Sequence, residues 1–165
     1  MCFTHIKVKV VLIFFFFFTE ISSQEIFTIE IDGSNLPDDS GTITEGQKIF
    51  LENCKGCHGF SGEGLYGPEL VGRSSLSGEN ISKTLGNYWP YAPKIFDYIK
   101  RAKRKENDSY FSNSEVYSLT GYLLKLNNLF KEEVINKKNL SNIKMPNRNG
   151  FISEIKVIIK EKSNL

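Results

Sequence analysis

The chain has 165 residues, of which 40% are hydrophobic and 24% are charged, and its formal net charge is +2. This length suits one domain and leaves no room for a second large one. The composition excludes a wholly disordered chain, which would be poorer in hydrophobic residues and more strongly charged.

Residues 1–23 are expected to form a signal peptide. A short positive region with Lys7 and Lys9 precedes nine apolar residues, Val10–Phe18, and small residues follow as far as Ser23. This order is typical of an export signal, and the apolar run is shorter than the roughly 20 residues that span a bilayer. We therefore expect a periplasmic protein. Contact with a membrane is expected only if the signal stays uncleaved as an anchor, an alternative that the weak cleavage site leaves open.

Cleavage would remove most of the potential soft and imidazole ligands of the chain. Met1, Cys2 and His5 all lie within the signal peptide. The mature chain would keep one histidine, His58, one methionine, Met145, and two cysteines. Any metal or cofactor site must be built from this short set of side chains.

The mature chain begins with an extended N-terminal arm, residues 24–40. Phe27–Ile31 alternates between apolar and polar residues in a pattern typical of a strand, and turn-forming residues follow. An isolated strand is not stable by itself. We therefore expect the arm to lie across a partner subunit or to add to the edge of a sheet.

Three helices are predicted in the domain that follows, residues 41–130. Two begin at capping boxes, a proline marks the start of the other, and the last is the most amphipathic segment of the chain. The three signals are Thr44 with Gln47, Pro93, and Ser112 with Glu115. Residues 131–165 are expected to be a C-terminal tail that wraps the domain or a partner, with a weak strand or helix near 152–160. The fold class is therefore all-α.

The chemistry of the chain is concentrated in Cys54–His58, which reads Cys-Lys-Gly-Cys-His. This is the haem attachment signature of c-type cytochromes. Two thiols three positions apart can add to the two vinyl groups of one porphyrin, and the adjacent imidazole reaches the iron. We expect one covalent haem c, attached through Cys54 and Cys57 and ligated by His58. A disulfide and a zinc site are the alternatives, although zinc needs more Cys or His ligands than the mature chain has.

The chain resembles class I cytochromes c around this motif. Gly46 and Phe50 match the first helix of that fold where it crosses the last, and Gly121–Leu123 match the last helix. More narrowly, residues 27–151 resemble the cytochrome subunit of the Sox sulfane dehydrogenase and of related sulfite dehydrogenases. The segments that carry this likeness are Gly41–Gln47, Leu85–Ala92, Phe96–Ile99, Glu115–Tyr117 and Lys144–Phe151. The resemblance implies a class I cytochrome c fold, with about three helices around one haem.

The resemblance also implies a function. In that family the haem protein accepts electrons from a molybdenum-containing dehydrogenase subunit, which acts on sulfite or sulfane sulfur, and passes them to a downstream cytochrome. It further implies that the Pro68 carbonyl accepts a hydrogen bond from His58 and raises its basicity. The chain has no substrate-binding constellation of its own, so we expect an electron-transfer subunit, with no nucleic-acid partner. A homologue that binds haem but has lost its partner is a further hypothesis.

The sixth ligand of the iron is where this sequence departs from the family. A methionine is usual at the position of Lys103. Because His58 is the only histidine of the mature chain, bis-histidine ligation is excluded. Met145, a deprotonated Lys103 and an open or water-bound position remain as candidates, and Met145 is preferred because thioether ligation suits electron transfer. An open position would instead indicate a gas sensor or a haem enzyme.

A dense basic run, Lys100–Lys105, follows the second predicted helix. It could steer an acidic electron acceptor toward the protein. The alternative is a solvated helix end that the helix dipole favours.

Overall fold

The computed structural model describes residues 28–151, except residues 73, 78–80, 104 and 106–108. The expected signal peptide and the weak element expected near 152–160 lie outside the described residues. Within them the helices are α1 (Ile43–Asn53), α2 (Lys55–His58), α3 (Leu85–Tyr88), α4 (Ala92–Ala102), α5 (Asn113–Leu126) and α6 (Lys137–Asn142), and the strands are β1 (Ser40–Thr42) and β2 (Val134–Asn136). The mostly helical class is confirmed, with three longer helices and three short ones. None of the helices in this part of the chain is long and apolar enough to cross a membrane.

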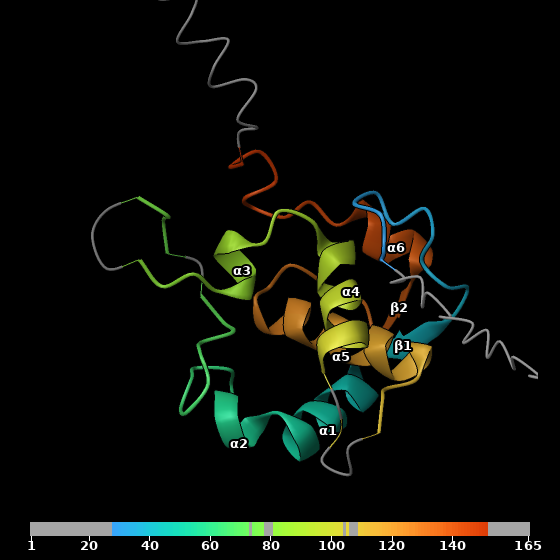
Figure 1. Ribbon diagram of the computed structural model, residues 1–165, viewed down its shortest axis with the longest axis horizontal. Coiled ribbons are helices and arrows are strands. Elements are labelled where there is room, and N and C mark those ends of the chain that lie inside the picture. Colours follow the sequence, from blue (N-terminus) through green and yellow to red (C-terminus); the bar gives the residue numbers. More distant parts are fainter. Residues whose placement is uncertain (1–27, 73, 78–80, 104, 106–108, 152–165) are drawn as a thin grey trace, which may run out of the picture.

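The first and last long helices, α1 and α5, cross in close contact (Figure 1). A Cβ atom at Gly46 would overlap the backbone carbonyl of Ser118, and one at Gly121 would lie 2.6 Å from the side chain of Ile43. The absence of a side chain at these two positions lets the backbones approach. The expected crossing is therefore confirmed.

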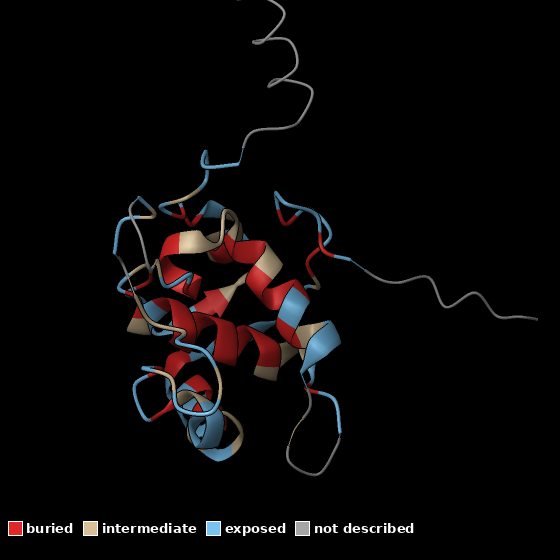
Figure 2. Ribbon diagram, turned by 60° about the vertical axis from the view of Figure 1, so that its left-hand side comes forward, coloured by how far each residue is buried: buried red, intermediate tan, exposed pale blue. Residues whose placement is uncertain are grey.

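Helix α5 lies at the centre of the molecule. Its nine residues Val116–Leu124 are all buried, including Ser118 and Thr120, and Figure 2 shows buried residues along its length. A helix that is surrounded by other elements is buried on all sides. The prediction that this is the most amphipathic segment is therefore wrong for Val116–Leu124, which have no exposed face.

The start of α5 agrees with its capping box, whereas the start of α1 does not agree with the predicted one. Ser112 and Glu115 exchange the expected hydrogen bonds at the start of α5. At α1 the N-cap is Thr42, whose hydroxyl accepts from the Glu45 amide at 3.2 Å, and the hydroxyl of Thr44 donates to Glu133 instead. The helix begins earlier because Thr42 ends β1, where pairing with β2 holds it extended.

The described part of the expected C-terminal tail packs on the domain. Strand β2 pairs antiparallel with β1, and α6 contacts α4. The apolar side chains of this segment are buried in the same core as those of the helices: Ile135, Leu140, Ile143 and Met145. Residues 131–151 therefore contribute to the hydrophobic core of the domain.

The N-terminal arm also packs on its own domain. Ile29 and Leu36 are buried in the core. The Ile29 amide donates to Asp97 Oδ1 at 2.9 Å, and Lys94 Nζ donates to the Ile29 carbonyl at 2.7 Å. Side chains of α4 thus satisfy backbone groups that a neighbouring strand would otherwise pair. Residues 28–36 therefore form no strand and pack on α4 of their own domain, and the contact of the arm with a partner or a sheet edge stays a prediction.

Candidate haem attachment site

The cysteines and the histidine of the motif lie on a single helical turn. Helix α2 follows α1 with only Cys54 between them, and the amides of Cys57 and His58 donate to the Cys54 carbonyl at 3.2 and 3.0 Å. Residues three and four apart in a helix lie on the same face. The turn therefore presents the two thiols and the imidazole together, and both thiols are free, with no disulfide between them.

The two thiols differ in their surroundings. Cys54 is half-buried and packs against the core, whereas Cys57 is exposed. Burial raises the pKa of the Cys54 thiol to about 11, and the nearby ammonium of Lys103 opposes this rise. One attachment point thus lies against the core and the other at the surface.

The imidazole of His58 has one nitrogen engaged. Its Nδ1 lies 2.7 Å from the carbonyl oxygen of Pro68, as the resemblance implied. A carbonyl can only accept, so we assign the proton to Nδ1, which leaves the lone pair of Nε2 free in the neutral ring. This is the arrangement of a histidine that binds a metal through Nε2.

The loop after α2 is fastened to the turn by backbone hydrogen bonds. The amides of Leu65 and Gly67 donate to the Cys57 carbonyl at 3.0 and 2.8 Å, and that of Gly64 donates to His58 at 2.8 Å. A Cβ atom at Gly67 would lie 3.0 Å from Cε1 of His58. The loop therefore lies tightly against the imidazole, and only glycine fits there without a shift.

The donor set fits a haem better than a bare metal ion. Among residues 28–151 that the structure describes, no group of three or more His, Cys, Asp or Glu side chains could hold a metal ion. A porphyrin itself supplies four nitrogen ligands, so one imidazole suffices to ligate its iron from the protein. Two free thiols and one free imidazole nitrogen on a single turn match this requirement.

The structure places Lys103 near the attachment turn. It is the C-cap of α4, and its ammonium lies 5.2 Å from the ring centroid of Tyr98. Tyr98 in turn contacts Trp89 edge to face at 5.6 Å. The charge of Lys103 acts on the Cys54 thiol, so this group of side chains lies on the side of that cysteine.

Met145 lies elsewhere. It is 3% exposed and belongs to the hydrophobic core. Residues 143–151, which follow α6, run along the side of the molecule opposite to α2 (Figure 1). The side chain of Asn147 ties this segment to α3 by donating to the Tyr88 carbonyl at 2.7 Å. Met145 thus lies in the core next to a segment that is tied to α3, and its role as the sixth ligand stays a prediction.

Three charges of the basic run at the end of α4 are compensated within the chain. Arg101 pairs with Asp97 at 2.8 Å, Lys105 pairs with Glu115 at 2.7 Å, and Lys100 Nζ donates to the Phe111 carbonyl at 2.9 Å. Charges held in this way produce a weaker external field than a free basic patch. The described part of Lys100–Lys105 therefore gives little support to the docking of an acidic acceptor.

Sequence reasoning missed Asn127, the C-cap of α5. It is fully buried, and its side-chain amide bonds to the backbone at Gly72, Leu70 and Leu123. Nothing in the sequence distinguishes it, because an asparagine just after a helix is common.

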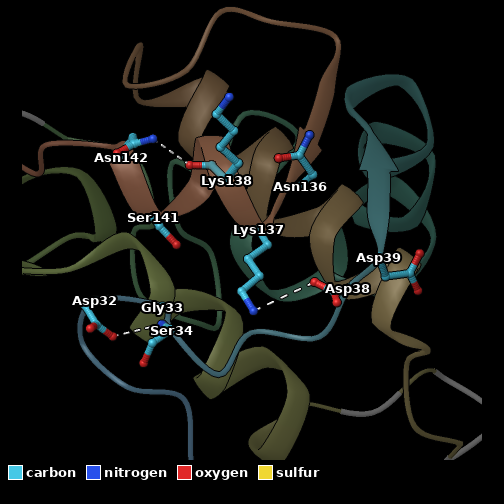
Figure 3. A pocket seen from close by; sticks show the side chains of 10 residues that line it. All are labelled: Asp32, Gly33, Ser34, Asp38, Asp39, Asn136, Lys137, Lys138, Ser141 and Asn142. Atoms are coloured by element: carbon cyan, nitrogen blue, oxygen red, sulfur yellow. Dashed lines mark hydrogen bonds and ion pairs between the residues drawn. The ribbon is translucent and has the colours of Figure 1, made fainter.

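A polar depression of about 680 Å³ lies between the turn at Asp32 and helix α6 (Figure 3). Three of its charged groups are already engaged: Asp38 faces Lys137 at 3.8 Å, and Asp32 accepts from the Ser34 amide at 2.9 Å. We assign no ligand to it.

Comparison with known proteins agrees with this geometry. The family model for cytochrome c matches residues 43–127. Among solved structures, the chain is similar to the sulfane dehydrogenase SoxCD from Paracoccus pantotrophus, with a TM-score of 0.74 and 31% sequence identity over 87% of this chain and 72% of that chain. No curated protein matches the chain.

Proposed function

This chain belongs to the cytochrome c family, whose members carry covalent haem c, and from that premise we propose that it carries one such haem and transfers single electrons. The observation that carries the proposal is the single turn on which the two free thiols lie beside a histidine whose Nδ1 is bonded to Pro68. When bound, the haem supplies a one-electron iron couple.

The residues of the chain would hold and orient that group. Cys54 would fix one edge of the ring against the core, and Cys57 would fix it at the surface. His58 would ligate the iron through Nε2, with Pro68 holding the proton on Nδ1. Pro68 would also increase the electron donation of the imidazole.

We propose a molybdenum-containing dehydrogenase subunit as the electron donor. The likeness to SoxCD, a sulfane dehydrogenase, supports this partner at 31% identity. The substrate class of the complex would be sulfite or sulfane sulfur. Electrons would leave to a downstream cytochrome, and the complex would work in the periplasm, where the signal peptide proposed for residues 1–23 would deliver this chain.

The loop fastened to α2 is the surface proposed for the approach of this donor. It exposes Phe60, Leu65 and Tyr66, with 68%, 63% and 96% of their surface accessible. Exposed apolar groups on a rigid loop are typical of interaction surfaces. A donor that docks here would lie beside the attachment turn, because the same loop is bonded to Cys57 and His58.

Reconstitution tests both the donor and the surface. The haem-loaded protein, mixed with the dehydrogenase and sulfite or a sulfane donor, is expected to show haem reduction under turnover. Replacing both Phe60→Ser and Tyr66→Ser should weaken docking at least about tenfold, since apolar anchors each contribute about 1 kcal/mol or more. The control is Ile31→Ser, which removes another exposed apolar residue, 53% accessible, from the N-terminal arm.

Each outcome bears on one part of the proposal. Absence of haem reduction with the unaltered protein would exclude the dehydrogenase as donor while leaving the cytochrome assignment intact. Equal reduction rates for the unaltered protein and the Phe60/Tyr66 variant would exclude the loop as the docking surface. A loss with Ile31→Ser would indicate that the arm takes part.

A second function, a gas sensor or haem enzyme with an open sixth position, is favoured by Lys103, which stands where the resembling family usually has a methionine. We expect the reduced haem protein to bind carbon monoxide at a rate proportional to its concentration if the position is open. If Lys103 ligates the iron, the rate should instead saturate, and Lys103→Ala should restore proportionality. A far-red thioether band in the oxidised spectrum that disappears in Met145→Ala would contradict both and restore Met145 as ligand.

A further inference from the structure

The buried side chain of Asn127 fastens the segment that follows Pro68. It is 0% exposed. Its Oδ1 accepts from the Gly72 amide at 3.1 Å, and its Nδ2 donates to the Leu70 carbonyl at 3.1 Å and to the Leu123 carbonyl of its own helix at 2.9 Å. The end of α5 is thus joined to both sides of Val71.

This fastening reaches the histidine through a short stretch of backbone. Pro68, whose carbonyl bonds His58 Nδ1 at 2.7 Å, lies two residues before Leu70. The amides of Leu70 and Val71 also donate to the Gly62 carbonyl at 2.8 and 3.1 Å. Residues 68–72 are therefore held at one end by the imidazole and at the other end by Asn127.

The surroundings of the Asn127 amide leave little freedom. A Cβ atom at Gly86 would overlap its Oδ1, and the Thr84 hydroxyl donates to the Gly72 carbonyl at 2.8 Å. Helix α3 and its N-cap Thr84 therefore pack directly against the Asn127 amide and the Gly72 backbone. A buried amide with both of its polar atoms paired holds its partners in one arrangement, because leaving them unpaired is costly.

We propose that Asn127 is a positioning residue for His58: through residues 68–72 it holds the Pro68 carbonyl on Nδ1 of His58 and so sets the electron donation of Nε2. The proposal rests on the haem ligation proposed above. A shorter Nδ1–H···O contact makes the imidazole a stronger donor, which favours the oxidised iron. Loosening the contact should therefore favour the reduced iron.

The test uses the haem-loaded Asn127→Ala variant. Its reduction potential is expected to rise by the equivalent of a tenfold change in the ratio of reduced to oxidised protein, about 59 mV for one electron. Exchange of the His58 Nδ1 proton with solvent, followed by NMR, should become about tenfold faster because the loop opens more often. If this variant does not accumulate, Asn127→Ser leaves a polar group in the site but lacks the amide that reaches Gly72 and Leu70, and it should shift the potential and the proton exchange in the same directions.

The matched control is Asn139→Ala in α6. The Asn139 side chain also makes three hydrogen bonds, to Asn136, Val134 and Glu132, but none to the loop. It should leave both the potential and the proton exchange unchanged. Unchanged values in the Asn127 variants, or an equal shift in Asn139→Ala, would overturn the proposal. Absence of haem from the unaltered protein would overturn it together with the proposed function, whereas absence of reduction by a dehydrogenase would remove only the proposed donor.

Discussion

Replacing both Cys54 and Cys57 by serine is expected to abolish covalent haem attachment completely. Each thioether needs a thiol, and these are the two free cysteines among the described residues. Serine keeps the size and polarity of the side chain but cannot form the bond. Acidified organic solvent should extract all haem from the double variant and none from the unaltered protein, and only the latter should retain haem on a denaturing gel.

The third cysteine of the sequence provides the control for this experiment. Cys2 lies in the segment expected to be removed as a signal peptide. Cys2→Ser should therefore leave attachment unchanged. Covalent haem in the double variant, or its loss in Cys2→Ser, would contradict attachment at α2.

The second large effect is expected at Asp97. Its side chain is 2% exposed and accepts hydrogen bonds from Arg101 Nε and Nη2 at 3.0 and 2.8 Å and from the Ile29 amide at 2.9 Å. Lys94 lies 3.1 Å away. Asp97→Ala would leave these donors without their acceptor, and we expect the free energy of unfolding to fall by about 3 kcal/mol. Urea unfolding, monitored by circular dichroism, measures this change in the free energy of unfolding.

The same carboxylate should make stability depend on pH. Burial alone would raise the pKa of Asp97, but the hydrogen bonds from Arg101, Ile29 and Lys94 outweigh it and hold the pKa at about 2, below its ordinary value of 3.8. The contribution of Asp97 to the free energy of unfolding is therefore complete above the pKa of this carboxyl in the unfolded chain. It is lost as the pH falls from about 4 through 2. The difference between a pKa of about 2 in the folded protein and 3.8 in the unfolded chain corresponds to about 2.5 kcal/mol.

Two results would contradict this role of Asp97. One is a loss below about 1 kcal/mol in Asp97→Ala at pH 6, which is the range of an exposed ion pair. The other is a difference between variant and unaltered protein that stays constant from pH 6 to pH 2. Glu45→Ala is the control, since Glu45 is about half-exposed and lies 3.8 Å from Lys48. It should change stability little at either pH.

The start of a helix can be predicted from the sequence only where the residues that cap it are neighbours in the chain. The capping box of Ser112 and Glu115 is complete within four residues, so the start of α5 could be predicted. The start of α1 could not, because strand pairing across the molecule holds Thr42 extended and makes it the N-cap. The residues around Thr42 do not themselves indicate this pairing, so the N-cap cannot be predicted from them.

The sequence by itself determined the chemistry of the attachment turn, because Cys54, Cys57 and His58 lie within one helical turn and local geometry brings them together. Only the tertiary structure decided what surrounds that turn. It packed the arm on Asp97, placed Met145 in the core and joined Asn127 to the loop after Pro68. Asn127 and Leu70 lie 57 positions apart in the sequence, and Ile29 and Asp97 lie 68 positions apart. Such pairings follow from the packing of α4 and α5 and not from the residues next to them in the chain.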